Sequence, residues 1–445
     1  MQISIHRQFL KYTFPTVLAM LVNGLYQVVD GIFIGRYVGA DGLAGINIAW
    51  PVIGTILAIG MMIGVGTGAL ISIRQGQKDA MGAKQVLATG FMLLVILAPI
   101  VAGCLYWLSD DFIFWQGAQQ RIFELAQQYL HVLIGACIFT LGSISIPFLL
   151  RNDNSPNFAT CLMVIGALLN IAFDYVFIAI LEWELTGAAI ATGLAQMFVT
   201  IMGVSYFFSH RATLRLGKSG FRPKLYLVPK IAFIGFASFF MYAYGAIMIA
   251  VHNGLFAYYG DQVIIGAYAI LGYIVTVYYL IAEGIANGMQ PLASYYYGAN
   301  HQVNVKKLLK MAVMSTVGIG LTFMCLLNLF PNIFVSVFNH SDQQLIESAT
   351  TGIHLHLFAL AFDGFLVVAA AYYQAIGKGA KAMFVTIGNI LIQLPFLYLM
   401  PKLIGLKGIW LAYPMSNVVL SVFVVAMLIK DIRRYPNQQP TRSLA

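Results

Sequence analysis

The chain has few charged residues, and this shortage excludes most classes of soluble protein. Asp, Glu, Lys and Arg make up 9% of its 445 residues, whereas 60% are hydrophobic and the mean hydropathy is +0.82. A soluble globular domain does not reach these values. Because helices satisfy their own backbone hydrogen bonds in lipid, the composition predicts an all-α protein that crosses a membrane many times.

Cysteines and catalytic motifs are also scarce. The four cysteines show no disulfide or metal spacing, and we expect them to be apolar core residues: Cys104, Cys137, Cys161 and Cys325. A P-loop, an HExxH motif and a GxSxG motif are missing from the sequence. A polytopic membrane enzyme is therefore the less favoured interpretation, no cofactor is expected, and an ion gradient is the expected energy source.

Long hydrophobic runs divide the chain into twelve predicted transmembrane helices. Each run is long enough to cross a bilayer. They cover residues 10–34, 43–72, 83–108, 122–149, 158–181, 187–209, 229–257, 262–290, 308–335, 350–375, 381–401 and 408–429.

The net charge of +9 reports topology rather than a polyanionic partner such as nucleic acid. If the N-terminus is cytoplasmic, all but four of the 25 Lys and Arg fall in inner segments, the exceptions being Arg36, Arg121, Lys402 and Lys407. This asymmetry is a strong positive-inside signal. It predicts that both termini are cytoplasmic, in the cytoplasmic (inner) membrane of a bacterium or archaeon.

The two halves of the sequence match at an offset of about 222 residues. The offset pairs Gly66 with Gly288, Gly76 with Gly298 and Lys84 with Lys306, among other identities. Since each half holds six helices, both halves enter the membrane from the same side, related by a pseudo-two-fold axis along the membrane normal. We predict an N-terminal lobe of residues 1–215 and a C-terminal lobe of residues 216–445, with a substrate cavity between them.

Two acids lie inside predicted helices of the first lobe. Asp30 lies inside the hydrophobic stretch from about Phe14 to Ile34, and Asp174 lies four residues after Asn170 on one helix face. Ala188 and Thr192 in the sixth helix are also four apart. These residues could form an oxygen-rich pocket for Na⁺ or a shared proton. The alternative is a hydrogen bond that only stabilises packing, but intramembrane acids are costly and usually functional.

Pro15 is the predicted hinge, and Tyr26, Asp363, His252 and Glu283 are secondary candidates. Pro15 precedes Asp30 by about four turns and either permits a kink or sits harmlessly in the first turns. Asp363 is a third intramembrane acid, and Glu283 lies toward the inner end of the eighth helix. His252 occupies the repeat position of Asp30, because 252 − 30 = 222, and its side chain titrates near neutral pH.

These features together resemble the multidrug and toxic compound extrusion (MATE) family. The resemblance rests on the two six-helix lobes, on Pro15 followed by the segment from Tyr26 to Asp30, and on Asn170 with Asp174. The carboxylates lean toward the DinF-like branch. The seventh helix lacks the glutamate of another bacterial branch, although Asp363 falls where that branch has an aspartate.

The resemblance implies a cation-coupled drug antiporter. It implies that Asp30 and Asp174 bind the coupling H⁺ or Na⁺, that Asn170, Ala188 and Thr192 line the pocket, and that Pro15 lets the first helix bend when Asp30 is protonated. The expected partners are amphipathic cationic drugs and the lipid bilayer, and the expected state is a monomer. A flippase for a lipid-linked or amphipathic substrate is the alternative transporter.

Overall fold

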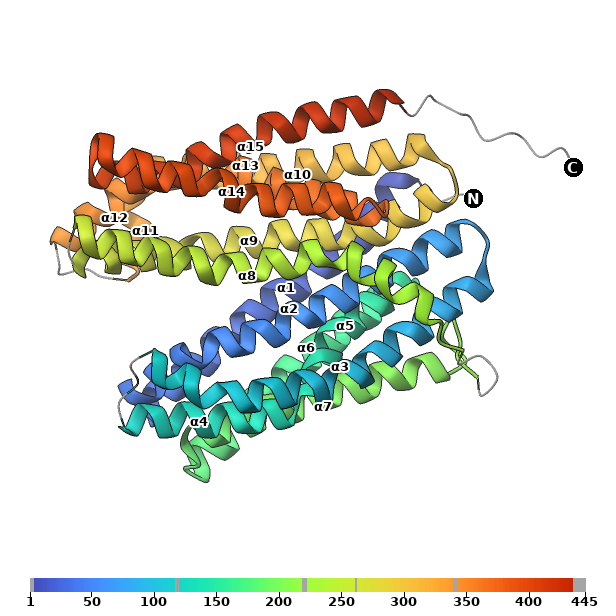
Figure 1. Ribbon diagram of the computed structural model, residues 1–445, viewed down its shortest axis with the longest axis horizontal. Helices are drawn as coiled ribbons and strands as arrows, with labels where there is room; N and C mark the ends of the chain where they lie inside the picture. The colour runs from blue at the N-terminus through green and yellow to red at the C-terminus, as the bar shows by residue number, and fades with distance from the viewer. Residues whose placement is uncertain are drawn as a thin grey trace, which may run out of the picture. The chain divides into compact units, whose positions relative to one another are not determined.

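The computed structural model describes residues 4–434, apart from residues 117, 119, 218–221, 261 and 339–342. The described residues form long helices and no strand (Figure 1). Within these ranges, ten helices are long and apolar enough to cross a membrane, and two further pairs of shorter helices, each bent at a break, bring the number to twelve. The predicted all-α polytopic fold is confirmed.

The chain folds into two compact units. The N-unit comprises Leu18–Ala243, and the C-unit comprises Met1–Val17 together with Tyr244–Ala445. Both units are helical bundles. The boundaries fall inside two helices, so that the first part of α1 belongs to the C-unit and the first part of α8 to the N-unit.

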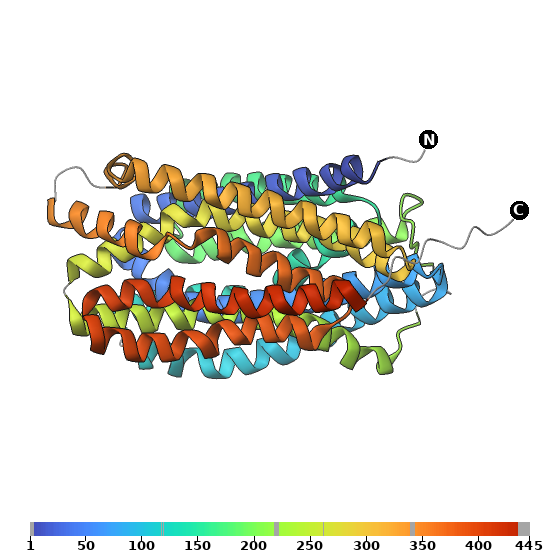
Figure 2. The ribbon, with the colours of Figure 1, turned by 90° about the horizontal axis from the view of Figure 1, so that it is seen from above.

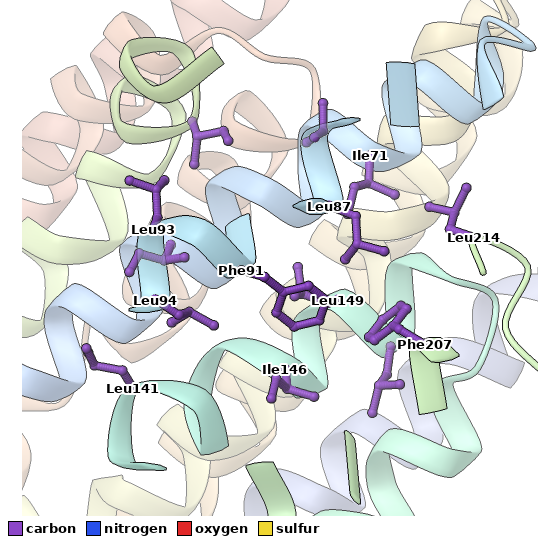
Figure 3. Close-up of a cluster of buried hydrophobic side chains, with 14 of the residues drawn as sticks. Ile71, Leu87, Phe91, Leu93, Leu94, Leu141, Ile146, Leu149, Phe207 and Leu214 are labelled. Atoms are coloured by element: carbon purple, nitrogen blue, oxygen red, sulfur yellow. The ribbon is translucent and has the colours of Figure 1, made fainter. Parts of the chain in front are cut away.

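The N-unit packs its helices around an apolar core. Phe91 and Phe207 meet edge to face in this core with ring centroids 5.6 Å apart, surrounded by side chains such as Leu87 and Leu149 (Figure 3). The N-unit holds most of α1 (Ile5–Tyr37), α2 (Ala40–Gly76), α3 (Ala80–Trp115), α4 (Gln120–Gly135), α5 (Cys137–Asn152), α6 (Pro156–Asp174), the π-helix η1 (Tyr175–Ile180), α7 (Glu184–Phe208), the 3₁₀ helix η2 (Leu225–Leu227) and the start of α8 (Val228–Tyr259).

The C-unit has a second core, in which Phe256 packs on Trp410 with ring centroids 4.4 Å apart. The last two helices, α14 and α15, lie side by side in both ribbon views (Figures 1 and 2). After α8 the unit continues with α9 (Gln262–Gly298), α10 (Gln302–Leu329), α11 (Pro331–Ser336), α12 (Gln343–His356), α13 (Leu360–Ala375), α14 (Gly379–Ile404) and α15 (Leu406–Arg434).

Helix ends recur at the offset of the sequence repeat. The helices α2 and α9 end at Gly76 and Gly298, a difference of 222. Lys78 and Asn300, again 222 apart, both adopt the left-handed conformation, with φ of 59° and 58°. The bent pair α4 and α5 (62°) has its counterpart in α12 and α13 (54°). The local backbone therefore repeats as the sequence predicts.

Glycines let the start of α8 pack closely on α2, and the start of α1 pack closely on α9. A Cβ at Gly66 of α2 would lie 2.1 Å from the Ile231 carbonyl oxygen of α8, and one at Gly235 would lie 2.0 Å from the Met62 carbonyl oxygen. In the C-unit, a Cβ at Gly288 of α9 would lie 2.6 Å from the Cα of Thr13 in α1. Small residues are the usual means by which membrane helices approach this closely.

The compact units differ at both boundaries from the predicted lobes of residues 1–215 and 216–445. The difference arises because the start of α8 packs on α2, and the start of α1 packs on α9. The lobes describe the sequence repeat, and their boundary stays a prediction.

Asp153 holds the segment after α7, around Thr213 and Leu214, by hydrogen bonds. Its carboxylate accepts hydrogen bonds from the backbone N–H groups of Thr213 (2.9 Å) and Leu214 (2.8 Å) and from the Tyr206 hydroxyl (2.9 Å). Burial raises the pKa of Asp153 above its ordinary value, although these three donors oppose the shift. The segment is thus part of the N-unit rather than a free linker.

The expectation that all four cysteines are core residues is wrong for three of them. Cys137 is buried, whereas Cys104, Cys161 and Cys325 are exposed on helix surfaces. A thiol behaves as a small hydrophobic group, so lipid can cover it as well as a protein core can. A position inside an apolar span therefore does not distinguish the core from the lipid-facing surface.

Candidate functional site

Two carboxyl groups of the N-unit lie close together inside the helical bundle. Asp30 of α1 is half-buried, and Asp174, the last residue of α6, is fully buried. The two carboxyl groups interact with each other. The structure thus brings together the two acids that the sequence singled out.

Most oxygens of this pair have no hydrogen-bond donor in the described part of the chain. Oδ1 of Asp30 and both carboxylate oxygens of Asp174 are buried without a partner among the described residues. Asn170 donates from Nδ2 to the Thr192 hydroxyl at 3.2 Å, and its own Oδ1 is likewise buried without a described partner. Two carboxylates, an amide oxygen and a hydroxyl form a donor set that suits a proton or a hard cation such as Na⁺.

The helix that carries Asp174 changes its winding directly after this residue. Residues Tyr175–Ile180 form a π-helix, and the chain then turns into α7. Single π-helical turns often mark functional sites, because the wider turn shifts the side chains beside it. The hydrophobic run of residues 158–181 contains no signal for this irregularity. Ala188 of α7 lies in the apolar core with Leu185 and Ile178, and its role in the pocket stays a prediction.

Two tyrosines lie within electrostatic range of both acids. Tyr26, one turn before Asp30 on α1, was a secondary candidate, but Tyr129 of α4 was missed. Tyr129 is 5% exposed and lies on the buried face of α4 with Leu125 and Leu133. A hydroxyl on an otherwise apolar face was the only available signal, and core tyrosines are too common for that signal to be specific.

Pro15 lies where α1 passes from one compact unit to the other. The helix continues through it, and the boundary between the units follows two residues later, between Val17 and Leu18. The Thr16 hydroxyl donates to the Tyr12 carbonyl oxygen at 2.7 Å. The position suits a hinge, which stays a prediction.

Asp363 of the C-unit has a different environment from the pair in the N-unit. The Tyr279 hydroxyl donates to its Oδ2 at 2.8 Å, and the Asn417 amide donates to its Oδ1. Tyr279 also contacts the Tyr413 hydroxyl at 3.0 Å. Both carboxylate oxygens of Asp363 therefore have described donors, in contrast to the pair in the N-unit.

His252, the repeat counterpart of Asp30, belongs to a cluster of rings. It stacks on Tyr268 with centroids 5.2 Å apart and meets His356 edge to face at 5.8 Å. Its Nδ1 lies 2.8 Å from the Met248 carbonyl oxygen, and its Nε2 is buried without a partner among the described residues. His252 therefore lies among aromatic rings, whereas Asp30 lies beside a second carboxyl group. Glu283 is half-buried on α9.

Comparison with known proteins gives matches along almost the whole chain. The multidrug export protein MepA of Staphylococcus aureus strain MSSA476 is 26% identical over 440 residues, which cover 96% of this chain and 94% of MepA. A solved structure described as MATE in the straight conformation superposes with a TM-score of 0.91 at 23% identity, covering 98% of this chain and 97% of that one.

A second solved structure, described as MATE in the bent conformation, superposes with a TM-score of 0.90 at 23% identity, covering 97% of this chain and 96% of that one. These two structures support the fold. The family model named MatE matches residues 15–176 and 234–399. The first of these ranges contains both acids of the pair, Asp30 and Asp174. From these matches we conclude that the chain belongs to the MatE family and is a multi-pass membrane protein.

Proposed function

We propose that the protein exports amphipathic cations in exchange for a coupling cation, with H⁺ favoured and Na⁺ as the alternative. The observation that carries this proposal is the set of buried oxygens without described donors at Asp30, Asn170 and Asp174. Two interacting carboxylates that are both ionised and unpaired are unfavourable in a medium of low dielectric constant. A bound proton or Na⁺ removes this cost.

Antiport requires that the coupling cation and the drug favour different conformations. Protonation of Asp30 removes a negative charge that attracts a cationic drug. Bending of α1 at Pro15 would then shrink the drug pocket. The proline's place at the boundary of the two units supports a hinge there. The straight and bent forms described for solved relatives are consistent with such a movement.

The substrate class follows from the relatives and from the charge of the site. MepA is named as a multidrug export protein, and a carboxylate pair in an apolar bundle attracts organic cations. The positive-inside pattern supports cytoplasmic termini in the cytoplasmic membrane. One chain carries the complete set of oxygens, so a monomer suffices.

Efflux from proteoliposomes tests the proposal. Ethidium transport is measured with a pH gradient alone and with a Na⁺ gradient alone, for the wild type, Asp30→Asn and Asp174→Asn. We expect the pH gradient to drive transport and each variant to lose it by about tenfold or more, since charged hydrogen-bonding groups contribute roughly 1.5–3 kcal/mol.

Asp41→Asn is the matched control, because it removes an exposed carboxylate at the start of α2. It should transport like the wild type. Wild-type rates in Asp30→Asn would contradict the coupling role of the pair, and transport driven only by Na⁺ would replace H⁺ with Na⁺ as the coupling ion.

A further inference from the structure

A polar stripe runs along α9 in the C-unit. Tyr279, Glu283, Asn287, Gln290 and Ser294 follow at intervals of three or four residues, which places them on one face of the helix. Asn287, Gln290 and Ser294 are buried, at 8%, 2% and 0% exposure. An unbroken row of polar groups inside a transmembrane helix is costly and usually marks an ion route.

One end of the stripe joins the Asp363 network. The Tyr279 hydroxyl donates to Asp363, and Glu283 follows Tyr279 by one helical turn. At the other end, Gln290 donates from Nε2 to the Ser294 hydroxyl at 3.3 Å. Between them, Nδ2 of Asn287 is buried without a partner among the described residues. Buried amides in such a position commonly bind water or an ion.

The repeat shows that the fold itself does not require polar residues at three of these five positions. At the offset of 222, Tyr279, Glu283 and Asn287 correspond to Leu57, Met61 and Val65 of α2 in the N-unit. Met61 and Val65 pack together with Phe148 in an apolar cluster. The equivalent helix is therefore stable with apolar side chains, and the polar ones on α9 serve another purpose.

The surrounding helices contribute both signs of charge. The helices α1, α8, α10, α12, α13 and α15 contact α9. Their charged and titratable side chains, in the part of each helix that belongs to the C-unit, are His6, Arg7, Lys11, Tyr12, Tyr244, His252, Tyr258, Tyr259, Lys306, Lys307, Lys310, Cys325, Glu347, His354, His356, Asp363, Tyr372, Tyr373, Lys407, Tyr413, Lys430, Asp431 and Arg433. The Lys and Arg residues, Glu347 and Asp431 lie toward the ends of their helices, so Asp363 and Glu283 are the carboxylates within the span on these described helices.

We propose that Glu283 is a second binding position for the coupling cation, reached from the end of α9 near Gly298 along Ser294, Gln290 and Asn287. The positive-inside pattern predicts that this end is at the cytoplasmic face. Because its residues from Asn287 to Ser294 are buried, the stripe suits a proton, a water chain or a small ion rather than a drug. This inference rests on the proposed cation-coupled export and assigns it a second carboxyl in the other compact unit.

The test measures cation release from the purified full-length transporter. Ethidium is added to the protein in weakly buffered detergent solution, and released protons are followed with a pH indicator, with a parallel experiment on displaced ²²Na⁺. In Glu283→Gln we expect the release to fall by about one cation per transporter, because one carboxylate holds one charge. Glu347→Gln is the matched control, since Glu347 is exposed in the same unit.

Two further variants use residues that the chain itself tolerates in the equivalent helix. Glu283→Met should reproduce the loss seen in Glu283→Gln, and it replaces that variant if Gln prevents folding. Asn287→Val should keep the amount of cation released but slow its release in a stopped-flow measurement. Release of wild-type amount from both Glu283 variants would overturn the site, and a wild-type rate in Asn287→Val would overturn the route.

The test of Glu283 can be distinguished from the test of the acid pair, Asp30 and Asp174. If Asp30→Asn releases as many cations as the wild type while Glu283→Gln releases fewer, the proposed role of the pair fails and the role of Glu283 stands. The opposite result leaves the pair in place and removes Glu283 from the mechanism.

Discussion

Asp30 and Asp174 differ from Asp363 in what surrounds their oxygens. Asp363 receives a donor on each oxygen, whereas three of the four oxygens in the pair have none among the described residues. Hydrogen-bond donors stabilise the ionised form of a buried carboxyl group, whereas an ionised pair without donors is stabilised by a cation that can arrive and leave. This contrast favours the pair as the exchanging site.

The sequence predicted the acids because a carboxylate in an apolar run carries a visible cost. Asn170 and Thr192 followed from helical spacing, and their hydrogen bond is present. Tyr129 could not be found in this way, because an aromatic residue on the buried face of a helix needs no special explanation. Its position beside the acids depends on how α4 packs on other helices, which no local pattern records.

Tyr129→Phe tests whether this hydroxyl supports coupling. The variant keeps the ring, so the fold should be unchanged, while ethidium efflux driven by a pH gradient should fall roughly three- to tenfold with the loss of a hydroxyl group within electrostatic range of the acids. Tyr106→Phe, at a 56% exposed position of α3, is the control. Equal efflux rates in wild type and Tyr129→Phe would make Tyr129 a packing residue only.

At the scale of the helices, the close crossing of α2 and α8 depends on two glycines. Gly66 and Gly235 face the partner helix's backbone, and an added Cβ would lie about 2 Å from a carbonyl oxygen in either case. Backbone cannot move aside as the end of a flexible side chain can. The repeat pattern identified Gly66 as a paired position, but it gave no indication of the helix that Gly66 contacts.

Gly235→Ala should therefore destabilise the protein by about 1–3 kcal/mol, the usual cost of overpacking. The measurement is thermal unfolding of the purified protein in detergent. Gly54→Ala on α2 and Gly245→Ala on α8 are the controls, because nothing lies within 4 Å of a Cβ at either position. If Gly235→Ala unfolds at the same temperature as these controls, the helices α2 and α8 cross less closely than described.

For the molecule as a whole, composition predicted the class of protein, and the long hydrophobic runs predicted the number of spans. Two of the twelve spans are bent pairs, and their breaks at Ala136 and near Phe358 left no mark in the hydropathy. The division into compact units was also beyond the sequence, because it depends on contacts between residues more than two hundred positions apart.

The predicted topology can be checked in intact cells. Cysteine substitutions at Glu182, between η1 and α7, and at Gln77, after α2, are made in a variant whose four native cysteines are serine. A membrane-impermeant maleimide should label the cysteine at position 182 and leave the one at position 77 unlabelled until the cells are opened. The reverse pattern would invert the orientation and place both termini outside.

The packing of α1 on α9 has a consequence for synthesis. Residues up to Val17 leave the ribosome first, but the unit they complete begins again only at Tyr244, which is 244 − 17 = 227 positions later. At a synthesis rate of about 5–20 residues per second, the start of α1 waits on the order of ten to fifty seconds for its partner helices. During this interval the start of α1 lacks the helices that pack on it in the folded chain, so this part of the C-unit can assemble only late in synthesis.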